Sequence, residues 1–239
     1  MSKKIYITID GPAGAGKSTV ARMLARRLGF QYIDTGAMYR AVALKALRTG
    51  VDLNDEAALA ELAASAEIKL ADGPGGSIRV FLDGEDVTRA IRSLEVTKNV
   101  SLVARAAGVR NELVRRQRKM AGAGENTGTG TGTETGPRGV VMEGRDAGTV
   151  ILPEAQFKFF LTASAEERAR RRQKDLQDEG REVPLVRLKR EIEERDRLDS
   201  SREVAPLRPA QDAQVIDCSR LSAAQVVEMI ASRVGGKTG

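Results

Sequence analysis

A glycine-rich stretch near the start of the chain has the residue types and the spacing of a nucleotide phosphate site. Residues 11–19 fit the pattern G-x-x-x-x-G-K-[ST] at every fixed position. In such a loop the glycines let successive backbone N–H groups turn inward around phosphate oxygens. Lys17 can reach the β- and γ-phosphates, and the Ser18 hydroxyl can coordinate Mg²⁺. We therefore expect a nucleoside triphosphate to bind through Gly11, Pro12, Ala13, Gly14, Ala15, Gly16, Lys17, Ser18 and Thr19, with Ser18 as the metal ligand.

The segments on both sides of this loop are suited to holding it. Residues 4–9 are β-branched and apolar and run into Asp10, which predicts a buried strand. Apolar residues recur at helical spacing from Lys17 to Leu28, and Gly29 follows as a natural C-cap. A helix that begins at Lys17 points the positive end of its dipole at the phosphates.

A second strand and helix follow directly. Residues 30–34 predict a strand, and residues 35–40 begin a helix. Strand, helix and strand within some 30 residues indicate a parallel sheet with right-handed crossovers. Thr35 would lie at a helix N-terminus, where anions bind, with Arg40 about one turn later. The alternative is that neither residue binds an anion, with Thr35 an ordinary N-cap and Arg40 a surface arginine.

The rest of the chain alternates between sheet-like, helical and highly polar segments. Residues 67–71 and 77–82 alternate polar with apolar side chains, and a second turn follows at Asp83 and Gly84. This pattern predicts a small antiparallel hairpin or meander inserted in the parallel fold. Residues 41–64 and 93–119 are expected to be helical, the second stretch basic and broken. Three further strands are expected at 140–142, 157–161 and 214–218, and a closing helix at 222–234.

Two segments have an unusual composition. Residues 121–136 contain Gly and Thr with no large apolar residue, which predicts a flexible surface loop. Residues 165–202 hold 12 basic and 11 acidic side chains among 38. That composition is typical of a solvated, salt-bridged helix pair, and a charged mobile flap would share it.

Charge and cysteine content limit the classes of partner and compartment. The net charge is +6, and residues 103–119 hold five Arg and one Lys against one Glu. A basic stripe can bind nucleic acid, but this one has no aromatic residues between the charges to stack on bases. A site for several nucleotide phosphates would explain the same excess of basic residues. A single cysteine, Cys218, excludes an internal disulfide and fits a reducing compartment. We expect a cytoplasmic monomer with neither a nucleic-acid nor a membrane partner, since no apolar run approaches membrane-spanning length.

Other features select among the proteins that share a phosphate loop. No N-K-x-D tetrapeptide is present to read guanine, which argues against a GTPase. The strand expected at 140–142 does not end in the apolar run plus lone carboxylate that is typical of a Walker B site. Arginines instead follow several expected strands. Phosphoryl transfer needs two phosphates held in line, neutralised charge and excluded water, so the sequence favours a small-molecule kinase.

Five segments together resemble the bacterial cytidylate kinases, a branch of the nucleoside monophosphate kinases. The segments are TIDGPAGAGKS (8–18), IDTGAMYR (33–40), FLDGEDVT (81–88), EGRDAGT (143–149) and RDRLDSSREVAPL (195–207). The resemblance implies an α/β P-loop kinase fold, with a five-stranded parallel sheet flanked by helices. It implies a single domain over residues 1–239, with a monophosphate-binding insertion at about 41–120 and a charged helical lid at about 165–202.

The resemblance also implies an activity and roles for single residues. The activity is the ATP- and Mg²⁺-dependent phosphorylation of CMP and dCMP to CDP and dCDP in pyrimidine nucleotide metabolism. Thr35, Arg40, Arg145 and Arg202 would hold the acceptor phosphate, Ser101, Arg110 and Asp146 the cytosine, and Asp199 the ribose. The catalytic residues would be Lys17, Arg145, Arg195 and Arg202, with Arg168 and Arg172 acting from the lid.

The sequence departs from the family at two places. The family motif usually reads D-G-R-D, whereas Glu143 stands at its first position, and we expect a conservative change behind the site. The Gly/Thr tract at 121–136 looks like an extra insertion. The alternative functions are a sibling P-loop kinase acting on UMP, AMP or a non-nucleotide acid, and a nucleotide-dependent RNA-binding or switch protein.

Overall fold

The expected strands form one parallel sheet in the computed structural model, which describes residues 4–73, 76–123, 137–178 and 180–236. In order across the sheet the strands are β2 (Gln31–Asp34), β6 (Gly139–Gly144), β1 (Ile5–Asp10), β7 (Phe157–Thr162) and β8 (Gln214–Asp217). Every neighbouring pair is parallel, so all five carboxyl ends lie at one edge. The predicted fold class, an α/β P-loop kinase fold with five parallel strands, is confirmed.

Helices cover both faces of the sheet because side chains alternate along each buried strand. Ile7 and Ile9 of β1 pack in one core with α1 (Lys17–Leu28) and α8 (Ala223–Gly235). Met142 of β6 belongs to a second core on the other face, formed with a π-helical turn, η3 (Ala147–Ile151). The helix bounds expected at Lys17 and Leu28 are confirmed, with Gly29 as the C-cap.

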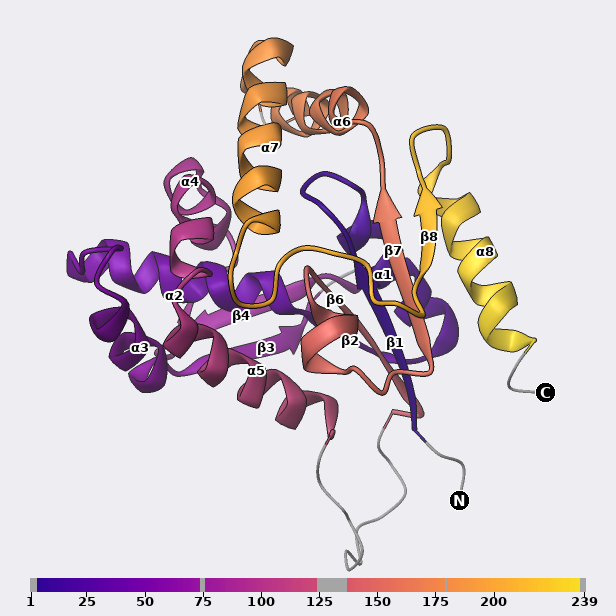
Figure 1. Cartoon of the computed structure of the whole chain (residues 1–239), viewed down its shortest axis with the longest axis horizontal. Coiled ribbons are helices and arrows are strands. Elements are labelled where there is room, and N and C mark those ends of the chain that lie inside the picture. The colour runs from indigo at the N-terminus through magenta and orange to yellow at the C-terminus, as the bar shows by residue number, and fades with distance from the viewer. Residues whose placement is uncertain (1–3, 74–75, 124–136, 179, 237–239) are drawn as a thin grey trace, which may run out of the picture.

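Two charged helices lie beyond the carboxyl edge of the sheet. They are α6 (Ala165–Asp178) and α7 (Leu185–Ser200), which Figure 1 shows above the tips of β1 and β7. Ala169 and Leu176 of α6 pack against Leu188 and Ile192 of α7, which buries a small apolar core between them. The helix pair predicted from the charge pattern of residues 165–202 is confirmed.

A second, antiparallel sheet lies beside the parallel one, with its own helices and core (Figure 1). Its strands are β3 (Ile68–Asp72), β4 (Ile78–Leu82) and β5 (Glu85–Asp86), and its helices are α2 (Thr35–Thr49), α3 (Glu56–Ser65), α4 (Leu94–Val103) and α5 (Ala107–Ala121). A 3₁₀ turn, η2 (Ala90–Arg92), precedes α4. The predicted antiparallel meander and the broken basic helix are confirmed, with β5 after the turn at Asp83 and Gly84, whereas η2 was not predicted.

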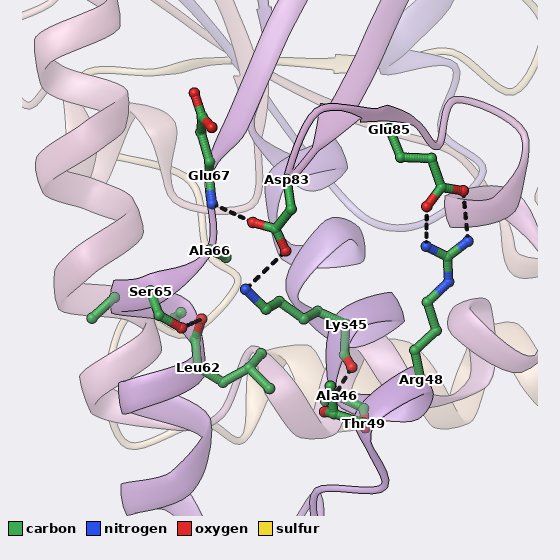
Figure 2. A network of polar contacts seen from close by, with 12 residues as sticks. Lys45, Ala46, Arg48, Thr49, Leu62, Ser65, Ala66, Glu67, Asp83 and Glu85 are labelled. Atoms are coloured by element: carbon green, nitrogen blue, oxygen red, sulfur yellow. Dashed lines mark hydrogen bonds and ion pairs between the residues drawn. The ribbon is translucent and has the colours of Figure 1, made fainter.

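A polar network fastens α2 to this small sheet. Asp83 stands in the turn before β5 at a φ of 50°, and its carboxylate accepts a bond from the Glu67 N–H at 2.8 Å. The Lys45 ammonium of α2 lies 2.9 Å from the same carboxylate. One turn further along α2, Arg48 donates two bonds to Glu85, as Figure 2 shows. The network sets the position of α2 against the antiparallel strands.

Most of the Gly/Thr tract lies outside the residues that the structure describes. Helix α5 ends at Ala121 and Gly122 caps it with a φ of 66°, while residues 124–136 are not among those described. The prediction of a flexible loop there stays a prediction. Among the described residues no helix has the length and apolar character needed to cross a membrane.

Candidate active site

The phosphate loop joins the carboxyl end of β1 to the first turn of α1. Gly11 has a φ of 146°, and a Cβ there would lie 2.0 Å from the Leu161 carbonyl oxygen, so only glycine fits beside β7. Within the loop the Lys17 ammonium donates to the Pro12 carbonyl oxygen at 2.8 Å. Burial lowers the pKa of Lys17, with the nearby Arg145 charge acting in the same direction. A loop that gathers buried positive charge is suited to nucleotide phosphates.

Glu143 brings a carboxylate to Ser18, at the start of α1. The Ser18 hydroxyl donates to Oε2 of Glu143 at 3.0 Å, and the Tyr32 hydroxyl donates to Oε1. Burial raises the pKa of Glu143, and Asp34 acts in the same direction. Two sequence predictions were wrong here. Strand β6 does end in an apolar run plus a carboxylate, since it extends through Glu143, and this carboxylate lies at the loop, not behind the site.

Asp10 connects the phosphate loop with the segment that carries Arg145 and Asp146. Its two carboxylate oxygens accept bonds from the Ala147 N–H at 2.9 Å and the Gly148 N–H at 2.7 Å. Asp10 is the last residue of β1, and the two N–H groups belong to the first turn of η3. Burial raises the pKa of Asp10 to about 6 although both N–H groups oppose that shift. Two parts of the site are thereby held at a fixed separation.

A cluster of arginines surrounds Asp199 near the end of α7. Arg145 donates from Nε to Asp199 at 2.9 Å, and Arg202 forms an ion pair with the same carboxylate. Ser101 of α4 contacts it at 3.4 Å. Asp199 is 1% exposed; burial alone would raise its pKa, but Arg145 and Arg202 outweigh burial and hold the pKa below its usual range. The structure thus brings together two of the sequence motifs, at 143–149 and 195–207, and adds Ser101 of α4.

The same cluster carries more positive charge than its carboxylate can neutralise. Nε of Arg195 and Nε of Arg202 are buried and have no hydrogen-bond partner among the described residues. Burial, reinforced by Arg145, lowers the pKa of Arg195 to about 9. The pKa of Arg40 falls to about 10, again through burial first. Desolvated guanidinium groups with open donors form a site for an anion such as phosphate.

Arg110 and Asp146 form a second buried pair beside this cluster. Arg110 of α5 binds the Asp146 carboxylate and also donates to the Ala104 carbonyl oxygen at 3.3 Å. Its guanidinium lies 5.7 Å from the centre of the Tyr39 ring. The Tyr39 hydroxyl is buried without a partner among the described residues. A planar ligand would find a donor, an acceptor and an aromatic ring here.

Thr35 and Arg40, the pair expected at the start of α2, are both engaged by the protein. The N-cap of α2 is Asp34, and the Thr35 hydroxyl donates to the Glu143 carbonyl oxygen at 2.7 Å. Arg40 donates to the Ile91 carbonyl oxygen at 3.0 Å and to the Thr97 hydroxyl at 2.8 Å. Arg40 nevertheless lies close enough to Arg145 for their charges to interact.

The two arginines expected to act from the lid have different surroundings. Arg168 is buried: it donates to the Ala163 carbonyl at 2.9 Å and the Ala13 carbonyl at 3.0 Å, and it pairs with Asp196 of α7 at 2.6 Å. Arg172, one turn later on α6, lies close enough to Arg40 to lower its pKa. The structure therefore gives Arg168 three protein partners, whereas the Arg172 charge acts on Arg40.

Sequence reasoning missed three residues of this site. The roles of Asp10, Tyr32 and Glu143 depend on contacts between separate strands. The signal for Glu143 was present, because an apolar strand that ends in a carboxylate next to a phosphate-loop strand is a recognisable pattern. For Tyr32 and Asp10 the register between strands is needed, and one sequence does not contain it.

Comparisons with known proteins show the family of this chain. The family model described as cytidylate kinase matches residues 7–235. A cytidylate kinase from Pelotomaculum thermopropionicum is 57% identical over 95% of each chain, and one from Desulforamulus reducens is 56% identical over 96% of each. A crystal structure of an uncharacterized protein from Eubacterium ventriosum shares the fold with a TM-score of 0.50 at 13% identity, covering 97% of this chain and 99% of that one. The chain belongs to the cytidylate kinase family.

Proposed function

We propose that this chain transfers the γ-phosphoryl group of ATP to CMP and dCMP at the carboxyl edge of its parallel sheet. The activity is that of its family: the chain phosphorylates CMP and dCMP in ATP-dependent catalysis. The observation that carries the residue roles is the arginine cluster around Asp199, with two buried donors unpartnered among the described residues. Positive charge of that density needs an anion, which the acceptor phosphate supplies.

The donor triphosphate is proposed to bind in the phosphate loop, residues 11–19. The backbone N–H groups of the loop and of the first turn of α1 would surround the β-phosphate. Lys17 would exchange its bond to the Pro12 carbonyl for the β- and γ-phosphates. A protonated ammonium there neutralises charge that develops as the phosphoryl group leaves ATP.

The residues beside the loop fit a magnesium ion. Mg²⁺ prefers oxygen ligands and usually binds to one or two protein groups plus substrate phosphates. The Ser18 hydroxyl and the Glu143 carboxylate, 3.0 Å apart, are such a donor set. When bound, the ion would supply positive charge that neutralises the phosphates. Ser18 would hold the ion, with the Glu143 carboxylate as a second oxygen donor beside it.

The acceptor phosphate is proposed to lie among the arginines. Thr35, Arg40, Arg145 and Arg202 would bind its oxygens, and Arg145, Arg195 and Arg202 would also stabilise the transferring group. Closing these segments around two phosphates excludes water and aligns the reacting oxygens. No strong general base is required, because the attacking phosphate oxygen is already an anion.

The nucleoside of the acceptor is proposed to lie between α4, α5 and the end of α7. Cytosine presents an exocyclic amino donor beside ring N3 and O2 acceptors. Asp146 would accept from the amino group, while Arg110 and Ser101 would donate to the ring acceptors. Asp199 would bind the ribose hydroxyls. The burial of Arg110 and Asp146 supports this assignment, since a dry polar pair discriminates strongly between bases.

The division of the chain follows from these roles. We propose one domain in which residues of about 41–120 bind the monophosphate and residues of about 165–202 form the lid, with Arg168 and Arg172 on its first helix. A monomeric state, a cytoplasmic location and the lack of a nucleic-acid partner also stay proposals.

A coupled assay that measures ADP formation with a panel of monophosphates tests the function. CMP and dCMP should give the highest kcat/KM, with UMP and AMP well below them. A preference for UMP or AMP would replace this assignment with a sibling kinase. Turnover that required RNA, or none with CMP, would indicate a switch or RNA-binding protein.

A further inference from the structure

Tyr32 and Glu143 lie on neighbouring strands and on the same face of the sheet. In the parallel pairing of β2 with β6, Tyr32 is opposite Val141 and Asp34 is opposite Glu143. Side chains two residues apart on a strand share a face, so Glu143 lies on the Val141 face. Val141 and Tyr32 both pack with the core under α1. That register places the Tyr32 hydroxyl diagonally across from the Glu143 carboxylate.

The two oxygens of this carboxylate are divided between two hydroxyl groups. Tyr32 donates to Oε1 and Ser18 donates to Oε2. The last torsion angle of a glutamate side chain, χ3, has only a weak preference, so the carboxylate can rotate over a broad range. The bond from Tyr32 removes that freedom, and the remaining oxygen then faces Ser18 at the first turn of α1.

We infer that Tyr32 is a positioning residue which holds the Glu143 carboxylate toward Ser18 and so sets the affinity of the site for a divalent cation. The inference rests on the proposed function, in which Ser18 and Glu143 bind Mg²⁺ with ATP. Tyr32 would act through Glu143, to which its hydroxyl donates. It acts in the way that outer partners of metal ligands do, by fixing the orientation of a group that must be ordered before the ion arrives.

The length of the Glu143 side chain makes this inference specific. Aspartate at this position would be shorter by one methylene group, so its carboxylate could not span the distance from Ser18 to the Tyr32 hydroxyl unchanged. The contribution of Tyr32 should therefore depend on glutamate. If the Tyr32 ring only filled space between β2 and α1, it would contribute equally to cation affinity with glutamate or with aspartate at position 143.

Metal binding without turnover provides the test. Tyr32→Phe removes one hydroxyl and keeps the ring. Tyr6→Phe, on β1, is the matched control, because the Tyr6 hydroxyl donates to the Gly122 carbonyl oxygen at 3.2 Å and not to Glu143. Mn²⁺ is titrated into each protein saturated with a non-hydrolysable ATP analogue and followed by electron paramagnetic resonance. Tyr32→Phe should weaken Mn²⁺ binding roughly ten-fold, and Tyr6→Phe should leave it unchanged. Metal-free affinity for the analogue should be equal in all three proteins.

A double-mutant cycle with Glu143→Asp completes the test. In the Glu143→Asp background Tyr32→Phe should have no further effect on Mn²⁺ affinity. Equal weakening in both backgrounds, or wild-type affinity in Tyr32→Phe, would overturn the positioning role alone. Unchanged Mn²⁺ affinity in Glu143→Gln would overturn it together with the proposed metal site. Turnover of CMP by the wild-type chain is measured separately, and its absence would overturn the proposed function.

Discussion

The Arg110 guanidinium and the Asp146 carboxylate form an ion pair whose side chains are only 3% and 4% exposed. Burial raises the pKa of Asp146, and Arg110 acts against that shift by stabilising the ionised form. Each group therefore depends on the other for charge compensation. A base that binds here meets a donor and an acceptor that water no longer solvates, so mismatched polar groups are costly.

Asp146→Asn should reduce the preference for CMP over UMP. Uracil carries a carbonyl where cytosine carries an amino group, and it would set an oxygen against the Asp146 carboxylate. An amide can rotate to suit either base, so the ratio of kcat/KM for CMP to that for UMP should shrink, with a loss for CMP on the order of 1–3 kcal/mol.

Asp199→Asn is the control for that prediction, because Asp199 is assigned to the sugar. It should slow CMP and UMP in about equal proportion. If Asp146→Asn also lowers both substrates equally, Asp146 does not read the base. Thermal unfolding of both variants shows whether unpaired arginines have changed the fold.

Lys17→Ala should abolish most of the turnover without unfolding the protein. Among the described residues the Lys17 ammonium donates one hydrogen bond, to the Pro12 carbonyl oxygen, and losing a single such bond costs roughly 1 kcal/mol. Removing one preorganised electrostatic group from phosphoryl transfer costs about 100-fold or more in kcat. Lys45→Ala, which breaks the ion pair with Asp83 in the small sheet, is the matched control and should keep near-normal kcat. Comparable turnover in the two variants would refute the assignment of Lys17.

The positions of the strands and helices along the chain were predictable, because glycines and charged residues separate the apolar runs. The helix from Lys17 to Leu28 has the expected bounds, since Gly29 takes the left-handed conformation that ends it. The antiparallel pairing of residues 68–72 with 78–82 follows from alternation alone. Local chemistry settles these features without any knowledge of distant partners.

What failed in the sequence reading depends on tertiary position. Glu143 looked like a residue after a strand, but the carboxyl end of a central strand opens on the phosphate loop, where a charge finds partners. Arg168 was expected to act from the lid, and its charged neighbours in the sequence give no sign that it is buried with Ala163, Ala13 and Asp196 as partners. The π-helical turn η3 has no sequence signal of its own, because Asp10 stabilises it from another strand.

Asp10 should make the protein more stable at mildly acidic than at neutral pH. Its pKa rises from 3.8 to about 6 on folding, so between these values the folded chain holds a proton that the unfolded chain has lost. The free energy of unfolding contributed by this group therefore falls as pH rises through that window.

The wild-type chain and Asp10→Asn, compared by denaturant unfolding at pH 7.5 and pH 5, isolate this effect, because other groups cancel in the difference. The wild type should gain about 1 kcal/mol over the variant on going to pH 5. A gain for the variant instead would mean that the bonds from Ala147 and Gly148 outweigh burial and depress the pKa of Asp10.

Arg168 and Arg172 lie one turn apart on α6 and should respond differently to the same substitution. Arg168 donates to two backbone carbonyls and pairs with Asp196, so Arg168→Met leaves several polar groups unsatisfied at the junction of the phosphate loop, α6 and α7. It should lower the free energy of unfolding by about 2–3 kcal/mol.

Arg172→Met should leave stability within roughly 0.5 kcal/mol of wild type, because Arg172 is a partly exposed residue of a charged helix. Its charge reaches Arg40 in the proposed acceptor site, so its loss should instead lower kcat by about ten-fold or more. Denaturant unfolding and steady-state kinetics on both variants separate the two effects. Unchanged kcat in Arg172→Met would exclude it as a lid arginine. Full stability in Arg168→Met together with a loss of kcat would assign the lid role to Arg168, and its carbonyl contacts would then have to open when nucleotide binds.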